Sequence, residues 1–305
     1  MGYFQRYGSV KPGLGFSQID LGHPFSKNLL LAVLFNEGRG PAIITPGSVA
    51  RGYQKTANTG SPTWSSNTHG LALHFPTTSD YITITDGTFS FLPSKNITIV
   101  VIRRKTDTTN RGAGFFGTTS TTASRCGAHC PYDDGIVYFD FGGTSSPNRL
   151  TKSGLSFSTT TPEKWIFHAG DAGSAIWQNG VKVASQSTAI SRTVANDNLT
   201  LNVGNGVNTC DIQDINYFAI YSTQWSDFLC QSWSSSPYEH LYSEIFGNKF
   251  YFLGAISSDV TGTLTETIPL IGLAESGSYK DNLPNTQTWP PGNVTLPIRQ
   301  FTRFS

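Results

Sequence analysis

The chain has 305 residues, a formal net charge of +1, 13% charged residues and 31 glycines. This length suits one main domain, since all-β sandwiches reach roughly 200–250 residues as single units. The near-neutral charge argues against a nucleic-acid-binding surface, and the low charge with many glycine and small polar residues is typical of short strands joined by turns.

Residues 1–24 are glycine-rich and end in His23-Pro24, which predicts an irregular arm without the apolar stretch of a signal peptide. The longest apolar run, Leu29 to Phe35, is far shorter than the roughly 20 residues that cross a bilayer. We therefore expect no membrane partner. Without a secretory signal, the four cysteines are expected to be free thiols.

Alternating or β-branched apolar patterns predict most of the regular structure, and residues 41–67 are expected to be mostly loop. Strands are predicted at 29–35, 71–75, 81–85, 96–103, 136–141, 199–203 and 215–221. Asn179-Gly180 predicts a type I′ turn in a hairpin over 176–183. Ser226 is a favourable N-cap, so one short helix is expected over 226–233, ending before Pro237.

The basic run Arg103-Arg104-Lys105 ends one of these strands, and we interpret it as a solvated strand end. The inward positions of the strands predict the core. Its expected members are Leu34, Leu73, Phe75, Ile82, Ile99, Val101, Phe139, Ile166, Val203 and Ile220.

Several short motifs occur in a familiar order. The first are His23-Pro24, followed by a strand that ends at Gly38, and the segment 70–75, followed by the segment 80–84. Trp165, the hairpin that contains Trp177, and residues 203–204 followed by 215–221 come next. The last is Ser236-Pro237-Tyr238-Glu239. Over residues 22–246 this order resembles the laminin G-like, concanavalin A-type jelly rolls common in phage and prophage structural proteins.

The resemblance implies an all-β, two-sheet antiparallel jelly-roll sandwich over 25–246, with an N-terminal arm over 1–24 and an extended C-terminal segment over 247–305. It also implies a non-enzymatic virion protein, a capsid decoration protein or a head or tail accessory protein. Its expected location is the virion, and its expected partners are other virion proteins and further copies of itself. A carbohydrate-binding adhesion module for host-surface glycans is the alternative, and it fits the fold equally well.

Related jelly rolls that cleave β-glucans carry carboxylates at alternate strand positions. No such string is present here. The nearest acidic groups are Asp133-Asp134 with Asp140, Asp211 with Asp214, and Glu239 with Glu244. Asp211 and Asp214 are an odd number of residues apart, so a regular strand would point them to opposite faces. We expect no catalytic residues and no cofactor.

Two metal sites can be considered. Cys126, His129 and Cys130 are close enough in sequence to bind zinc but lack a fourth ligand, so we interpret the cysteines as loop residues without a metal. The resemblance implies calcium ligands near the first and last strands, where Glu37 and Asp214 are the candidates by position, but calcium needs several oxygens. We predict no metal site.

Sugar binding would need exposed aromatic rings beside polar groups. Tyr53, Trp64, Tyr132 and Trp177 lie in or beside predicted loops. For each of them we favour the interpretation that the ring covers an edge of the core.

The segment 247–305 cannot form a core of its own. Residues 250–256 are apolar, and residues 261–270 alternate like a strand. The remainder is punctuated by prolines and is expected to run extended, without an internal hydrogen-bond ladder, and to dock on other chains. The predicted anchors are Trp289, Ile298, Phe301 and Phe304.

Overall fold

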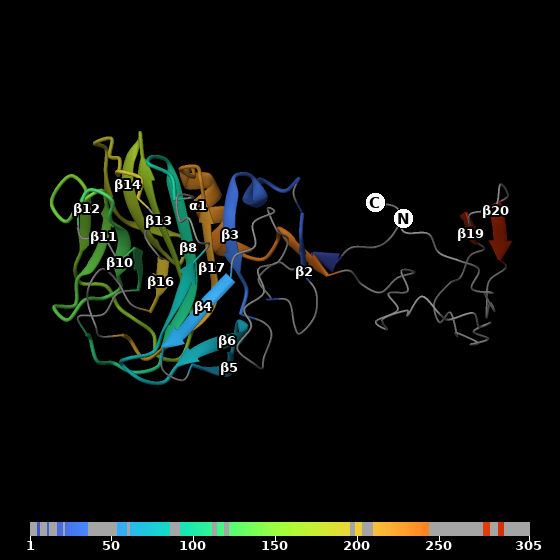
Figure 1. The fold of residues 1–305 in the computed structure, drawn as a ribbon, viewed down its shortest axis with the longest axis horizontal. Helices are drawn as coiled ribbons and strands as arrows, with labels where there is room; N and C mark the ends of the chain where they lie inside the picture. Colours follow the sequence, from blue (N-terminus) through green and yellow to red (C-terminus); the bar gives the residue numbers. More distant parts are fainter. Residues whose placement is uncertain are drawn as a thin grey trace. The chain divides into compact units, whose positions relative to one another are not determined.

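The computed structural model describes residues 5–6, 11, 17–20, 22–35, 54–59, 62–85, 92–111, 115–118, 122–195, 199–202, 210–243, 277–280 and 286–289. The chain divides into two units, Met1–Asn248 and Lys249–Ser305. The first unit contains two large antiparallel sheets packed face to face (Figure 1). The predicted two-sheet sandwich is therefore confirmed.

The first sheet has seven strands. Their order is β12 (Arg149–Lys152), β11 (Val137–Phe141), β10 (Cys126–His129), β9 (Phe116–Thr118), β16 (Leu199–Leu201), β7 (Tyr81–Thr85) and β4 (Gln54–Thr59).

The second sheet has eight strands. Their order is β15 (Val181–Gln186), β14 (Gly173–Gln178), β13 (Glu163–Gly170), β8 (Ile97–Lys105), β17 (Gln213–Tyr221), β6 (Gly70–Phe75) and β5 (Thr63–Asn67), with β3 (Leu29–Val33) also paired to β17. Since β8 pairs along most of one edge of β17, β3 and β6 share the other edge.

The main core lies between the two sheets. Seven predicted core residues belong to it: Leu73, Phe75, Ile82, Ile99, Val101, Phe139 and Ile220. Leu34 and Ile166 are also buried, but on the opposite face of the eight-stranded sheet. Val203 lies outside the described residues.

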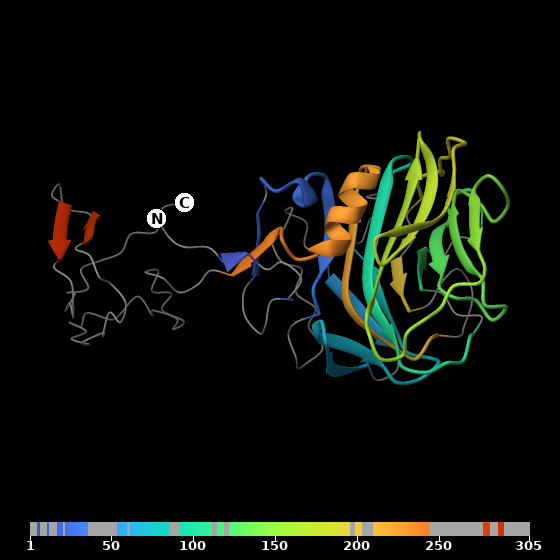
Figure 2. The same ribbon diagram turned by 180° about the vertical axis from the view of Figure 1, so that it is seen from behind.

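That opposite face is covered by helix α1 (Asp227–Ser235) and the 3-10 turn η1 (Pro24–Ser26). Figures 1 and 2 both place α1 on the side of the eight-stranded sheet that faces away from the other sheet. The Ser226 side chain accepts from Leu229 N at 3.4 Å, as expected for an N-cap. Trp233 and Cys230 are buried against the sheet, so the predicted helix is confirmed and forms a second apolar layer.

The predicted hairpin is also confirmed. Asn179 has φ 51° and Gly180 has φ 84°, the left-handed pair that a type I′ turn requires between β14 and β15. A β-bulge between Ile176 and Trp177 shifts the register of the hairpin.

The prediction that residues 41–67 are mostly loop is wrong for its described part, since residues 41–53 lie outside the described residues. Residues 54–59 and 63–67 form β4 and β5, because β4 pairs with β7 and β5 pairs with β6. These segments lack apolar alternation, so the pairing partners, rather than local propensity, make them strands.

Part of the N-terminal segment is regular. β1 (Gln5–Arg6) and β2 (Ser17–Ile19) flank β18 (Leu241–Ser243) in a three-stranded sheet. Lys11 is buried, and its Nζ donates to Phe35 O at 2.8 Å.

The second unit contains β19 (Gly277–Lys280) paired antiparallel with β20 (Thr286–Trp289). The prediction of no internal ladder in this segment is therefore wrong. Pro284 lies in the connection and Pro290 follows β20, so neither proline interrupts a strand. The predicted anchors Ile298, Phe301 and Phe304 lie outside the described residues, as does the predicted strand at 261–270.

Candidate functional site

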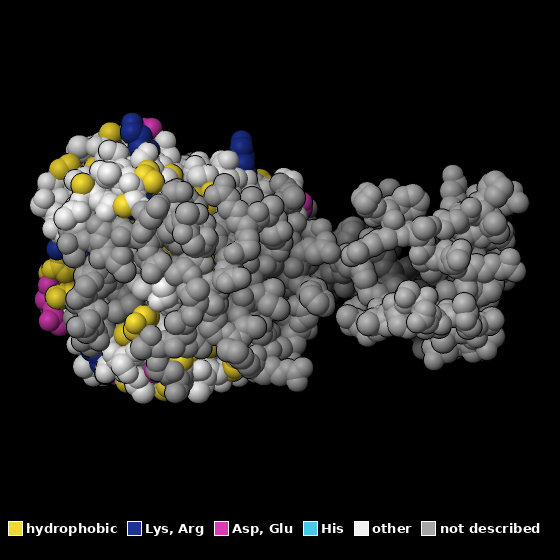
Figure 3. Space-filling model, viewed as in Figure 1, with side chains coloured by type: hydrophobic (Ala, Val, Ile, Leu, Met, Phe, Trp, Pro, Cys, Tyr) yellow, Lys and Arg dark blue, Asp and Glu magenta, His cyan; other side chains and the backbone are white. Residues whose placement is uncertain are grey.

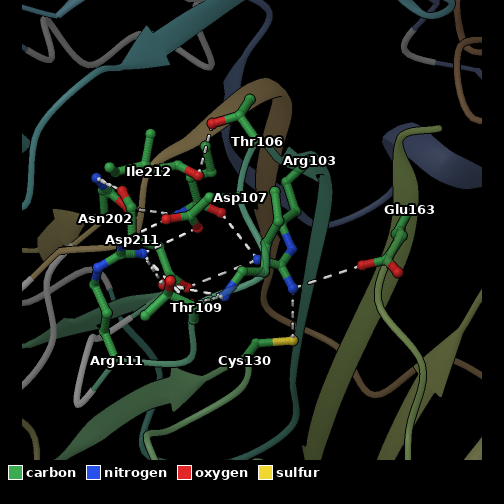
Figure 4. Close-up of polar contacts among 12 residues, drawn as sticks. Arg103, Thr106, Asp107, Thr109, Arg111, Cys130, Glu163, Asn202, Asp211 and Ile212 are labelled. Atoms are coloured by element: carbon green, nitrogen blue, oxygen red, sulfur yellow. Dashed lines mark hydrogen bonds and ion pairs between the residues drawn. The ribbon is translucent and has the colours of Figure 1, made fainter. Parts of the chain in front are cut away.

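The most extensive group of charges lies in the interior (Figure 4). Lys105 Nζ is 3.4 Å from Asp211 Oδ1, and Arg103 Nη1 is 3.9 Å from Asp211 Oδ2. Arg111 Nη1 is also 3.9 Å from Asp211 Oδ1, while Arg103 Nη2 is 3.6 Å from Glu163 Oε2. The side chains of Arg103, Lys105, Asp211 and Glu163 are at most 3% exposed.

The interpretation of Arg103-Arg104-Lys105 as a solvated strand end is therefore wrong. Alternation along β8 turns Arg103 and Lys105 toward the space between the sheets and Arg104 away from it. The Arg103 guanidinium also lies over the rings of Phe115 and Trp165, at 5.0 and 5.9 Å.

Burial governs the titration of this interior network. It lowers the pKa of Lys105 and raises that of Asp211, against the attraction between the two groups. Removing one member of such a network leaves its partners charged and unpaired in the interior. Its buried members lie on or beside β8, β13 and β17, so the network links neighbouring strands of the eight-stranded sheet. With so little exposure, these buried side chains offer no surface to a ligand.

Asp214 belongs to a separate group on the other face of the eight-stranded sheet. His74 Nδ1 lies 2.8 Å from Asp214 Oδ1, and Arg104 Nε and Nη2 donate to Asp214 Oδ2 at 3.0 and 2.5 Å. Asp211 and Asp214 therefore point to opposite faces, as predicted. The candidate calcium ligand Asp214 is occupied by these two side chains, and Glu37 lies outside the described residues.

The candidate zinc ligands do not converge. Cys126 and Cys130 are buried in the main core, whereas His129 lies on the opposite face of β10, beside Arg125 and Tyr132. Cys126 is a strand residue, so the loop prediction is wrong for it. Within the described part of the chain, no three Cys, His, Asp or Glu side chains form a metal-binding group.

All four cysteines are buried and outside disulfides, which confirms the expected free thiols. Burial raises the pKa of the Cys126 thiol to about 11, and those of Cys210 and Cys230 to about 12. Thiols react as thiolates, so the raised pKa values predict little reactivity for these groups in the folded protein.

The four aromatic candidates for sugar stacking have different environments. Trp177 is 2% exposed and packs beneath α1, and Trp64 packs against the main core, as the core-edge interpretation predicts. Tyr53 lies outside the described residues. Tyr132 differs from both tryptophans, because it is half-buried in a group of polar and aromatic side chains at the surface.

This group lies on the outer face of the seven-stranded sheet. We call it the Asp140 cluster, and it consists of Arg125, His129, Tyr132, Tyr138, Asp140 and Arg149. Val137, Phe139 and Phe141 of β11 face the main core, so Tyr138 and Asp140 between them face outward. The register of β11 with its two neighbours places Tyr138 between His129 and Thr151.

The rings of the cluster meet edge to face. His129 and Tyr132 have ring centres 5.0 Å apart at 79°, and Tyr132 and Tyr138 have centres 5.9 Å apart at 90°. The guanidinium carbon of Arg149 lies 4.7 Å from the centre of the Tyr138 ring. These contacts hold two half-buried phenol rings in fixed, perpendicular orientations.

Asp140 organises the charges of the cluster. Its side chain is 0% exposed and accepts from Arg125 Nε at 2.6 Å and from Arg149 Nε and Nη2 at 2.6 and 2.8 Å. The hydrogen bonds to Asp140 raise the pKa of Arg149, whereas burial lowers the pKa of Arg125. A buried carboxylate bound by two arginines is a structural support and is not free to act as a general acid.

The turn between β10 and β11 adds two exposed carboxylates, Asp133 and Asp134. Asp134 Oδ2 accepts from Tyr138 OH at 2.6 Å, and Asp134 Oδ1 accepts from Ile136 N at 2.8 Å. In Figure 3, acidic side chains lie beside hydrophobic-coloured ones at the edge of the molecule where Figure 1 draws β10 to β12. Carboxylate oxygens and hydrophobic side chains are therefore exposed together on this surface.

From the sequence, Tyr132 is an aromatic candidate and residues 136–141 are a predicted strand, but the partners of these residues are not predicted. Arg125 and Arg149 lie on different segments, and nothing in the sequence links them to Asp140 before the strands are paired. The third acidic pair named from the sequence is Glu239 with Glu244. The side chain of Glu239 is 44% exposed and lies near His23. Glu244 lies outside the described residues.

None of the helices in the described ranges is long and apolar enough to span a membrane. No protein-family model matches the chain, and no curated protein matches it. The resemblance to phage proteins of the laminin G-like family, and the virion role that it implies, therefore remain predictions; mass spectrometry of a purified particle would test them.

Solved structures do match the fold. The receptor-binding domain of botulinum neurotoxin type G has a TM-score of 0.51 and 13% identity, covering 68% of this chain and 51% of that one. The binding domain of Paraclostridial Mosquitocidal Protein 1 has a TM-score of 0.51 and 12% identity, covering 68% and 52%. The binding domain of botulinum neurotoxin DC in complex with SialylT has a TM-score of 0.50 and 9% identity, covering 68% and 51%. The chain thus spans about half the length of these structures, and at these identities the likeness concerns the fold, a β-sandwich shared with binding domains.

Proposed function

We propose that this chain is a non-enzymatic glycan-binding module and that the Asp140 cluster is its binding surface. The observation that carries the proposal is the pair of half-buried, perpendicular rings of Tyr132 and Tyr138 beside Arg149. This combination lies on the outer face of a sheet, opposite to the face that builds the core.

Sugars present two kinds of surface, and the cluster matches both. Their C–H faces stack on aromatic rings, which Tyr132 and Tyr138 supply. Their hydroxyl groups donate to carboxylates, which Asp134 supplies, and accept from N–H groups, which Arg149 supplies. Asp140 fixes Arg149 before a ligand arrives, so little side-chain entropy is lost on binding.

The same geometry supports binding over hydrolysis. A glycosidase needs two carboxyl groups that flank the bond to be cleaved and change protonation during turnover. Asp140 is enclosed by two guanidinium groups, and Asp134 already accepts two hydrogen bonds. The proposal also agrees with the matched structures, which are binding domains by name, one of them in complex with SialylT.

A glycan array tests the proposal when the protein is displayed in several copies, since single sites for sugars are often weak. Wild-type protein should bind a defined set of glycans, and Tyr132→Ala should weaken that binding at least about tenfold, or ~1.4 kcal/mol. Tyr81→Ala is the matched control, because Tyr81 is also half-buried but lies on β7, away from the cluster. Absence of binding by the wild type, or equal binding by Tyr132→Ala, would contradict the proposal.

A further inference from the structure

We infer that the Asp140 cluster selects glycans whose contacted sugar is uncharged and disfavours sugars that carry a carboxylate, such as sialic and uronic acids. This inference rests on the proposed function and adds a ligand class to the same surface. It follows from where the positive and negative charges of the site are placed.

The positive charges are already bound. Arg125 and Arg149 share the buried carboxylate of Asp140, through three hydrogen bonds of 2.6 to 2.8 Å. Arg125 is 5% exposed and also lies 3.1 Å from His129 Nε2. A ligand carboxylate is bound most strongly by a guanidinium or ammonium group that is free to pair with it. In the Asp140 cluster both guanidinium groups are already bound to a protein carboxylate, and the carboxylates of Asp140, Asp133 and Asp134 together outnumber them.

The negative charges, by contrast, lie at the rim of the cluster, which is the turn between β10 and β11. Asp133 and Asp134 are exposed in the turn that also carries Tyr132. Both affect the ionisation of Tyr138: its hydrogen bond to Asp134, and the negative charges nearby, raise the pKa of the phenol. A sugar stacked on Tyr138 or Tyr132 would therefore lie beside one or both of these carboxylates. A ligand carboxylate at this position would be repelled.

The rim also favours hydroxyl donors. An ionised carboxylate has about four lone-pair positions. Asp134 uses two of them, for Tyr138 OH and Ile136 N, so acceptor positions remain on both of its oxygens. Neighbouring hydroxyl groups on an uncharged sugar can donate to these positions, while the ring rests on a tyrosine face. The same groups that repel an acidic sugar thus bind a neutral one.

The test compares matched pairs of glycans on the array and by calorimetry. Suitable pairs are lactosamine with and without a terminal sialic acid, and cellotetraose against the β-1,4-linked tetramer of glucuronic acid. The wild type should prefer the uncharged member at least about tenfold at low salt, and the preference should shrink as salt is raised, because the charges concerned are exposed.

The variant Asp133→Asn/Asp134→Asn should reduce this preference several-fold by improving the binding of the acidic member, because amide side chains keep an acceptor oxygen but lose the charge. The control Asp227→Asn removes a similarly exposed carboxylate, on α1, and should keep the wild-type preference. If the wild type binds the acidic members equally or more tightly, and Tyr132→Ala loses that binding, this inference is overturned and the proposed function stands. No binding of any glycan would overturn the proposed function itself.

Discussion

The guanidinium carbon of Arg149 lies 4.7 Å from the centre of the Tyr138 ring, on the strand next to it in the sheet. The contact joins a cation to the face of an aromatic ring, and Asp140 holds the cation there through two hydrogen bonds. Because the Tyr138 ring is part of the proposed sugar-binding surface, the binding surface and the local stability of β11 depend on the same carboxylate.

Replacing Asp140 should therefore affect both stability and binding. Asp140→Asn leaves Arg125 and Arg149 without a counter-charge, and removing one partner of a buried ion pair costs about 3–5 kcal/mol. Urea denaturation should show this loss, and glycan binding should fall with it. Asp171→Asn removes a carboxylate that is 60% exposed and should leave the unfolding midpoint nearly unchanged. Equal midpoints for the two variants would show that the Asp140 pairing is not formed.

Replacing Gly180 with valine should destabilise the hairpin turn for two reasons. Gly180→Val places a side chain at φ 84°, a left-handed conformation that costs about 1–2 kcal/mol for a residue with a Cβ. The new Cβ would also lie 3.2 Å from Ser234 Cβ of α1.

Gly154→Val is the matched control, since Gly154 has φ 71° but no atom within 4 Å of an added Cβ. Thermal melts should rank wild type above Gly154→Val, and Gly154→Val above Gly180→Val. A Gly180→Val protein that melts with the wild type would rule out the type I′ turn.

Buried histidines should make the fold sensitive to acid. Burial lowers the pKa of His168 to about 4, and its Nε2 accepts from Trp177 Nε1 at 3.3 Å. With a pKa near 6.5 when unfolded, this histidine contributes stability that is full above pH 6.5 and is lost as the pH falls toward 4.

The free energy of unfolding, measured by urea between pH 6.5 and 4, should decline more gently for His168→Gln than for the wild type. A single group changes the slope by at most about 1.4 kcal/mol per pH unit. The variant should keep a residual slope from His240, whose pKa burial lowers to about 3. An unchanged slope in His168→Gln would mean that His168 is not buried in its neutral form.

The thiols give a rapid test of packing. In native protein at about pH 8, none of the four cysteines should react with a thiol reagent on the timescale of minutes, because burial raises their pKa values above the ordinary range. In denaturant all four should react at once. Rapid labelling of Cys126 in the native state would contradict the burial of β10 in the core.

The sequence predicted what depends on local pattern. Alternation identified the core strands, and Asn179-Gly180 and Ser226 identified the hairpin and the helix, because turn and cap chemistry depends on neighbouring residues. The strands β4 and β5 are not predicted from the sequence, because they form only through pairing with β7 and β6.

The candidate site was predicted in part, for the same reason. The sequence predicts Tyr132 as an aromatic candidate and a strand at 136–141, which contains Tyr138 and Asp140. Their grouping with Arg125 and Arg149 depends on the register of β10, β11 and β12. Arg103 and Lys105 were misassigned to solvent because their counter-charge, Asp211, is more than a hundred residues away in the sequence.

The layer formed by α1 gives the sandwich two unlike sides. The eight-stranded sheet is covered by α1 on its outer face, and the Asp140 cluster lies on the outer face of the other sheet. Phe228 projects from α1 with 73% of its surface exposed, so its side chain contributes little to the packing of the helix. A tether attached at position 228 would hold the protein by its helical side, and molecules immobilised in this way would all present the Asp140 cluster toward the solution.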